Sequence, residues 1–273
     1  MKKNLPLAMM QLFNEEPSSL EIDSIKYRNK QKVLFSTIIS KRKTVLETLK
    51  LNFKPIVLKF FIHIYLFFIP KNVKNFLNSF KNLDELGFLS IYRLSHINKL
   101  FFKHNPKIIY EFGSGVSTVF FCYLLDLRMK KTGIKGKLFS YEQSEQYYFK
   151  VIKYIPDYLK IYLNLNLSSL QYKKDNEYRA LSFKIDKYAD EIDLLYIDGP
   201  THQLIKDLPM GKQIYQINGN LIEIIRKKIV KLAFTDHRWN TYPILKYIIK
   251  KENLPYTLKI NNISKSITLS YTK

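Results

Sequence analysis

The sequence predicts an α/β fold, with a doubly wound, mainly parallel sheet, a C-terminal antiparallel hairpin and a helical N-terminal extension. Beyond residue 86, short apolar runs alternate with amphipathic segments of helical length. One of these runs leads into a glycine turn and a helix, as in a parallel βαβ unit. From Tyr256 to Tyr271 two alternating runs flank Asn261-Asn262, which predicts an antiparallel pair.

The elements of the sheet domain follow from these patterns in chain order. Apolar residues three or four apart, such as Ile91, Leu94 and Ile97, predict an amphipathic helix before the first strand. Expected helices are Phe88 to His104, Val116 to Lys130, Ser144 to Ile155, Asn220 to Lys228 and Tyr242 to Lys251. Expected parallel strands are Lys107 to Phe112, Lys137 to Tyr141, Leu159 to Leu165, Ile192 to Ile197 and Ile229 to Thr235.

The chain is expected to divide into two parts. With 273 residues, 46% of them hydrophobic, it has enough material for one sizeable core and an accessory segment. Residues 1–85 are predicted to form a helical, basic and aromatic extension, and residues 86–273 the α/β domain. Within the extension, Leu20 to Leu51 predicts one or two amphipathic helices.

The most apolar part of the extension, residues 56–69, fits two interpretations. It is bracketed by Lys54-Pro55 and Pro70-Lys71 and is too short to span a bilayer. It packs in the core, or it forms an interfacial helix that contacts an anionic membrane peripherally through its basic flanks.

Charge and cysteine content limit the classes of function. A net charge of +22 attracts acidic partners, but the basic residues form no distinct stripe. We therefore interpret the charge as that of a generic solvated surface, with an acidic partner such as anionic lipid, phosphorylated glycan or, less expected, nucleic acid as the alternative. Cys122 is the single cysteine, which excludes an internal disulfide and a thiolate metal site. The first residues do not resemble a secretory signal, so we expect a cytoplasmic protein.

A glycine turn at residues 111–118 carries the strongest chemical signal. Gly113 and Gly115 allow a tight turn and a close approach to a ligand, and Ser117 or Thr118 can cap the helix that follows. Thr118 occupies the third position of the dinucleotide fingerprint, where glycine is usual. Glu111 places a carboxylate beside the turn, which is unfavourable for a pyrophosphate.

Three motifs, in this order, resemble those of class I S-adenosylmethionine-dependent methyltransferases. The segment Glu111-Phe-Gly-Ser-Gly115 resembles the motif whose glycines pass under the methionine part of the cofactor and whose acidic residue holds its amino group. Ser140-Tyr-Glu142 resembles the strand end that accepts the ribose hydroxyls, and the run from Asp193 to Pro200 resembles the strand that borders the methyl-transfer site. The resemblance implies S-adenosylmethionine bound by Glu111, Gly113, Ser114, Gly115, Ser117, Thr118, Glu142 and Asp198.

The two glutamates differ in what they discriminate. A carboxylate such as Glu142 binds the ribose of NAD as well as that of S-adenosylmethionine. Glu111 favours S-adenosylmethionine, which carries an ammonium and a sulfonium but no phosphate. The alternatives are that Glu111 makes a local cap and that Glu142 is a solvated surface residue.

Catalytic candidates lie at two later strand ends. Asp198, His202 and Asp236-His237 are expected to converge on one crevice, because the carboxyl ends of parallel strands meet at one edge. We expect His202 or His237 to act as general base, with Asp198 and Asp236 orienting it or binding Mg²⁺. The alternative is that Asp198 shapes the Gly199-Pro200 turn and the histidines are merely exposed.

The acceptor is indicated only by resemblance. Gly-Ser-Gly-Val-Ser-Thr together with Tyr-Ile-Asp-Gly-Pro is similar to methyltransferase-like proteins of bacterial glycan pathways. This implies O-methylation of a glycan or small hydroxylated acceptor, in the cytoplasm or peripheral to the inner membrane. Two alternatives stay open: ribose or tRNA methylation, and a non-catalytic Rossmann-like scaffold at a membrane surface.

Overall fold

The computed structural model describes residues 18–31, 33, 69–80, 82–87, 89–175, 177–200, 217–236, 241–261 and 266–272. A first helix covers residues 19–31. The other helices are α4 (Lys71–Ser79), η1 (Leu83–Leu86, a 3-10 helix), α5 (Ile91–His104), α6 (Val116–Thr132), α7 (Glu145–Tyr154), α8 (Asp157–Lys160), α9 (Gly219–Arg226) and α10 (Thr241–Lys251). The strands are β1 (Ile108–Phe112), β2 (Lys137–Glu142), β3 (Leu163–Leu167), β4 (Leu170–Lys174), β5 (Arg179–Phe183), β6 (Ile192–Ile197), β7 (Val230–Asp236), β8 (Tyr256–Asn261) and β9 (Ser266–Tyr271).

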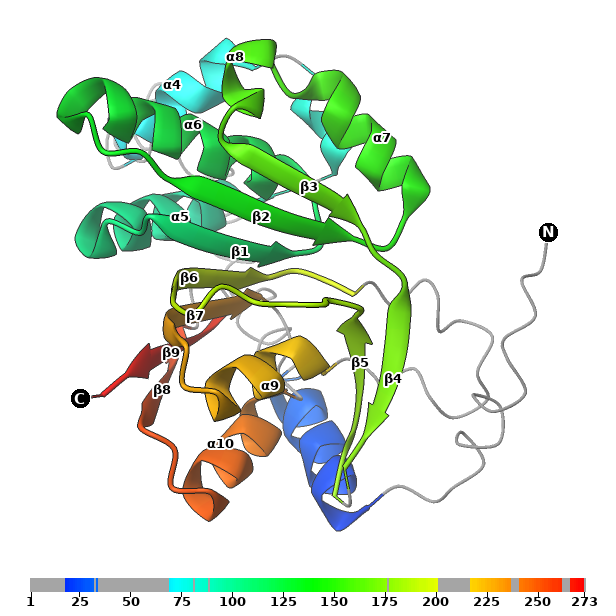
Figure 1. The fold of residues 1–273 in the computed structure, drawn as a ribbon. Coiled ribbons are helices and arrows are strands. Elements are labelled where there is room, and N and C mark those ends of the chain that lie inside the picture. Colours follow the sequence, from blue (N-terminus) through cyan, green and yellow to red (C-terminus); the bar gives the residue numbers. More distant parts are fainter. Residues whose placement is uncertain are drawn as a thin grey trace, which may run out of the picture.

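A seven-stranded sheet organises the chain in the order β3-β2-β1-β6-β7-β9-β8 (Figure 1). The first five of these strands pair in parallel, whereas β9 pairs antiparallel with both β7 and β8. The strand order reverses between β1 and β6, because the chain leaves the sheet at the edge strand β3 and returns to it in β6, beside β1. The predicted fold class, a doubly wound sheet closed by a C-terminal hairpin, is confirmed.

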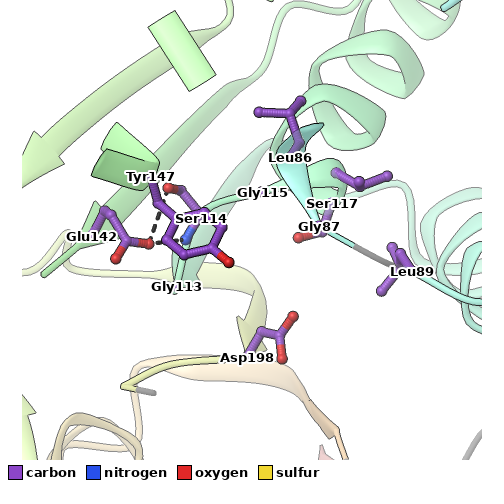
Figure 2. Close-up of a pocket in the computed structure, with 11 residues that line it drawn as sticks. Leu86, Gly87, Leu89, Gly113, Ser114, Gly115, Ser117, Glu142, Tyr147 and Asp198 are labelled. Atoms are coloured by element: carbon purple, nitrogen blue, oxygen red, sulfur yellow. Dashed lines mark hydrogen bonds between the residues drawn. The ribbon is translucent and has the colours of Figure 1, made fainter. Parts of the chain in front are cut away.

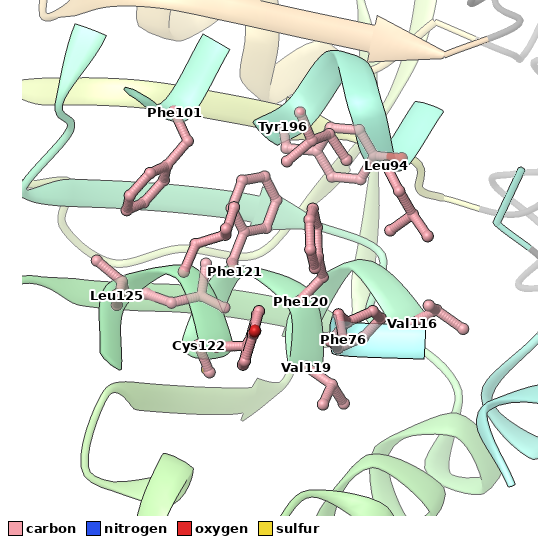
Figure 3. Close-up of a cluster of buried hydrophobic side chains, with 14 of the residues drawn as sticks. Phe76, Leu94, Phe101, Val116, Val119, Phe120, Phe121, Cys122, Leu125 and Tyr196 are labelled. Atoms are coloured by element: carbon pink, nitrogen blue, oxygen red, sulfur yellow. The ribbon is translucent and has the colours of Figure 1, made fainter. Parts of the chain in front are cut away.

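Helices cover both faces of this sheet (Figure 1). On one face α6 is buried almost all round, and Phe76 of α4 packs 4.7 Å from the ring of Phe120 (Figure 3). Cys122 lies in the same cluster as a small core residue, and burial raises the pKa of its thiol well above the usual value. The other face packs against α9, α10 and the helix at residues 19–31, to which Leu20 belongs.

The stretch from α8 to β5 differs from the predicted one in two ways. Leu159 lies in the short helix α8, which begins after Pro156, so β3 starts only at Leu163. Strands β4 and β5, which were not predicted, form a separate antiparallel pair. Its turn contains no glycine, and β5 is buried at every residue instead of on alternate ones, so neither hairpin signal is present in the sequence.

A buried ion pair fixes the helix at residues 19–31 to the sheet domain. Glu21 and Arg179 are 2% and 3% exposed, and the guanidinium donates to both carboxylate oxygens of Glu21 at 2.9 and 2.8 Å. The amide of Arg179 donates a further bond of 2.9 Å to the same carboxylate. Ser18 completes a capping box, since its hydroxyl accepts from the amide of Glu21 and its amide donates to the Glu21 carboxylate.

Two described helices of the predicted extension, the one at residues 19–31 and α4, therefore pack against the sheet domain. The division at residue 85 stays a prediction. Of the apolar segment 56–69, only Ile69 lies within the described residues, where it is buried. Among the helices that the structure describes, none has the length and apolarity needed to cross a membrane.

Removing one partner of the Glu21–Arg179 pair is expected to destabilise the fold. Glu21→Gln leaves a buried guanidinium without its counter-charge and should lower the free energy of unfolding by about 3 kcal/mol. Asp23→Asn, which removes an exposed partner of Lys26 from the same helix, should change it by less than about 0.5 kcal/mol. Urea unfolding of the three proteins checks this, and equal stabilities would contradict the structural role of the pair.

Candidate functional site

A cleft of about 180 Å³ opens at the carboxyl ends of β1, β2 and β6. This is where the strand order reverses, the usual position of ligands in open α/β sheets. The cleft is lined by the glycine turn, one carboxylate from each of the two neighbouring strand ends, and side chains from η1 and α7 (Figure 2). The lining residues are Leu86, Gly87, Leu89, Gly113, Ser114, Gly115, Val116, Ser117, Glu142, Tyr147 and Asp198.

The turn after β1 requires glycine at Gly113. Its φ of +94° is in the region that favours glycine, and a Cβ there would lie 2.6 Å from the amide nitrogen of Gly199. Gly199 is equally confined, because its own Cβ would lie 2.9 Å from the Cα of Gly113. Backbone hydrogen bonds from Asp198 and Gly199 to the carbonyl of Phe112 join the two strand ends.

Glu111 lies beneath the turn instead of in the cleft. It is fully buried and does not belong to the lining residues. Its carboxylate accepts three hydrogen bonds of 2.6 Å, from the hydroxyls of Ser117, Thr118 and Ser140. The hydroxyl of Thr118 in turn accepts from the amide of Gly115 at 2.9 Å. Thr118 is also fully buried, so these two predicted cofactor-binding residues support the turn from below.

Burial dominates the electrostatics of Glu111. It raises the pKa of the carboxyl to about 7, against the opposing effect of the three hydroxyl donors, and the negative charge of Asp198 adds to the rise. A positive charge placed in the cleft would act in the opposite direction and favour the ionised form.

Glu142 ends β2 and forms one wall of the cleft. One carboxylate oxygen accepts from the amide of Ser114 at 2.7 Å and from its hydroxyl at 3.0 Å (Figure 2). The other oxygen accepts from the amide of Ser144 at 2.8 Å. Burial raises the pKa of Glu142, and these hydrogen bonds oppose the rise. These hydrogen bonds fix the carboxylate in position, with one oxygen bound to Ser114 of the glycine turn and the other to the start of α7.

Asp198 follows β6 on the opposite side of the turn and is half-buried. Its carboxylate points into the cleft, across from Glu142 and Tyr147 (Figure 2). The structure thus brings together six of the predicted cofactor-binding residues in one cleft: Gly113, Ser114, Gly115, Ser117, Glu142 and Asp198.

Two parts of the lining were not predicted. Tyr147 comes from the first turn of α7, which begins after the capping residue Ser144. The segment around Gly87 follows η1 and closes another side, where the carbonyl of Leu86 would lie 3.0 Å from a Cβ at Gly115. The predicted α/β domain starts at residue 86, but nothing in the sequence linked this boundary to the glycine turn.

The remaining candidate residues, His202, Asp236 and His237, lie wholly or partly outside what the structure describes. His202 and His237 lie outside the described residues. Asp236 ends β7 opposite Ser266 of β9, and its side chain is not among those described. Across the side chains that the structure does place, no three histidine, cysteine or acidic residues gather closely enough to hold a metal ion. The Mg²⁺ site predicted at Asp198 and Asp236 stays a prediction, because the Asp236 side chain is outside that set.

The charge of the cleft is opposite to that of the chain. The chain has 45 Lys and Arg against 23 Asp and Glu. Yet the described lining includes two carboxylates, Glu142 and Asp198, and no lysine, arginine or histidine. The ligand that this lining favours is a cation with hydrogen-bonding groups.

Comparisons with known proteins return methyltransferases among solved structures. An SAH-bound methyltransferase from Podospora anserina is 13% identical, with 75% of this chain and 89% of that chain covered and a TM-score of 0.46. The O-methyltransferase NovP is 12% identical, with 67% and 81% covered and a TM-score of 0.43. The catalytic domain of hMettl16 in complex with a 3′UTR hairpin is 13% identical, with 69% and 71% covered and a TM-score of 0.41.

No protein-family model and no curated protein matches the chain. Similarities to solved structures at TM-scores below 0.5 do not identify a reaction. The function proposed below therefore rests on the chemistry of the cleft itself.

The buried carboxyl of Glu111 predicts a pH-dependent stability. Between about pH 4.5 and pH 7 the unfolded chain has lost the proton that the folded protein keeps, so the free energy of unfolding falls as the pH rises. The shift corresponds to roughly 3 kcal/mol over this window. Glu111→Gln keeps a hydrogen-bonding side chain but cannot titrate, so its stability should lack this fall.

Urea unfolding of both proteins at intervals from pH 5 to pH 8 provides the measurement. The difference between the two free energies, variant minus wild type, should grow with pH and level off above pH 7. A difference that stays constant would show that Glu111 is ionised in the folded protein throughout.

Proposed function

We propose that the chain is an S-adenosylmethionine-dependent methyltransferase whose cofactor occupies the cleft at the glycine turn. The observation that carries the proposal is the pair of carboxylates in a cleft without a described basic residue, in a strongly basic chain. S-adenosylmethionine carries a sulfonium and an ammonium, which this lining favours. A dinucleotide would bring a pyrophosphate to the glycine turn, close to Asp198 and above the buried Glu111, an unfavourable arrangement.

The glycines of the turn leave its backbone open to close approach by a ligand. Gly113 and Gly115 present backbone where any side chain would overlap Gly199 or the carbonyl of Leu86. Glu142 would accept the ribose hydroxyls, one of which would replace the Ser114 hydroxyl on the same carboxylate oxygen. Glu111 acts through Ser117 and Thr118 by positioning the turn. The positive charge of the bound cofactor would favour its ionised form, and the carboxylate would then add to the negative potential of the cleft.

Bound S-adenosylmethionine supplies an electrophilic methyl group, and transfer requires an acceptor aligned with it. Asp198 lies at the rim of the cleft at the end of β6, beside the strand end of β7. We propose a hydroxyl acceptor on a glycan or small molecule, supported by the Gly-Ser-Gly-Val-Ser-Thr and Tyr-Ile-Asp-Gly-Pro motifs. A hydroxyl needs a base, and His202 and His237 follow these two strand ends in the sequence.

Titration calorimetry distinguishes the cofactor classes. The wild type should bind S-adenosylmethionine and S-adenosylhomocysteine but not NAD. Glu142→Gln should weaken both by about tenfold, because a hydrogen bond to a charged group is lost. Asp198→Asn should weaken S-adenosylmethionine more than S-adenosylhomocysteine, which lacks the sulfonium charge. Glu145→Gln, an exposed carboxylate on the neighbouring turn, is the control and should bind like wild type. Binding of NAD alone would overturn the proposal.

The base assignment is tested by turnover. With a panel of mono- and oligosaccharides as acceptors, release of S-adenosylhomocysteine should fall about 10²- to 10⁴-fold in either His202→Ala or His237→Ala, whichever is the base. Affinity for S-adenosylmethionine should stay unchanged, which separates a catalytic effect from misfolding. Full turnover in the double variant would show that neither histidine is the base.

A further inference from the structure

A second cleft lies between the β4–β5 hairpin and α9, on the face of the sheet opposite α6 (Figure 1). Its volume is about 520 Å³, compared with about 180 Å³ for the cleft at the glycine turn. Ile222 and Glu223 lie one turn before Arg226 and the C-cap residue Lys227, so one face of α9 and its C-terminal end form a wall. The size is that of a small-molecule site.

This second cleft has the opposite charge from the first. Its lining contains four basic residues and two acidic ones: Lys173, Lys174, Arg226, Lys227, Asp175 and Glu223. An elongated anion that enters it meets a positive surplus, whereas the cleft at the glycine turn presents carboxylates. The two sites therefore favour different ligands.

Glu223 is the centre of the basic wall. Its carboxylate accepts from Lys173 at 2.5 Å on one oxygen and from Lys227 at 3.0 Å on the other, and the hydroxyl of Tyr188 lies 3.4 Å away. Burial raises the pKa of Glu223, but the two ammonium groups outweigh this effect and hold it below its usual value. One carboxylate thus holds two cations close together, with a surplus of one positive charge.

Arg226 has the reverse arrangement. Its guanidinium binds two carboxylates, Asp175 at 2.9 Å and Glu252 at 2.5 Å. It therefore ties the turn of the hairpin to the chain after α10 and is less available to a ligand. The two lysines at Glu223 are more available, because they share a single carboxylate between them, whereas Arg226 has two carboxylate partners.

We propose that this cleft binds a small phosphate-bearing molecule through Lys173 and Lys227. Either ammonium can turn from Glu223 to a phosphate oxygen while the other keeps the carboxylate paired, so Glu223 keeps a counter-charge when the ligand binds. Lys227 also lies 5.0 Å from the centre of the Tyr188 ring, which supports its stem at the edge of the cleft. The site is separate from the cofactor cleft and does not depend on the function proposed for it.

Calorimetry at low salt with inorganic pyrophosphate, a nucleoside diphosphate and a hexose phosphate tests the proposal. At least one should bind with one-to-one stoichiometry and weaken as salt is added. Tighter binding of the nucleoside diphosphate or of the hexose phosphate would identify the part attached to the phosphate. Lys173→Gln combined with Lys227→Gln should weaken binding at least tenfold. Lys160→Gln, an exposed lysine paired with Asp157 on α8, should change it less than twofold.

Glu223→Gln is expected to change the phosphate affinity in the opposite direction from the lysine substitutions. It removes the competing carboxylate, so phosphate binding should tighten several-fold, a result that a purely structural role for Glu223 would not produce. Thermal unfolding of each variant establishes that it is folded. Phosphate binding that is unchanged in Asp198→Asn separates this site from the first. Absence of binding by all three probes, or equal effects of the cleft and control variants, would overturn the proposal.

Discussion

A carboxylate sealed beneath a glycine turn is the interaction on which the candidate site depends. Glu111 is fully buried, and burying an ionisable group is costly unless its oxygens are satisfied. Three hydroxyls satisfy it, and they come from β2 and from the first turn of α6. Because Thr118 also accepts from the amide of Gly115, the requirement to solvate one carboxylate sets the conformation of the turn. The shape of the cleft above the turn depends on that conformation.

A steric constraint complements this polar one. Gly113 and Gly199 are in contact, so the ends of β1 and β6 approach more closely than side chains would permit. The carbonyl of Gly199 accepts from Asn218, and Asn218 also caps α9 through the amide of Leu221. The position of Asp198 is therefore set from both sides, by the turn after β1 and by the start of α9. The same helix continues into the wall of the second cleft.

The sequence was sufficient for the parts of the fold that depend on periodicity and turn chemistry. Strands β1, β2, β6 and β7 and the helices between them follow from apolar runs and caps, and their topology brings Glu142 and Asp198 to one edge. Depth within the fold was not predictable in the same way. Glu111 and Ser114 are three residues apart, yet one is sealed below the turn and the other lines the cleft. The β4–β5 hairpin was not predicted, because its β5 residues are buried on both faces and its turn lacks glycine. The contributions of Tyr147 and Gly87 are long-range contacts that leave no local pattern.

The net charge of the chain does not describe the charge that a ligand meets in the folded protein. Taken over the whole sequence, +22 favours acidic partners of any kind. The fold separates this charge locally, with carboxylates at the glycine turn and a lysine pair around Glu223 at the second cleft. Electrostatic attraction falls off within about 10 Å at moderate salt, so a ligand responds to the residues that line its site and little to the distant total. A cationic cofactor and an anionic ligand can therefore bind the same basic chain, each where the local charge is complementary to its own.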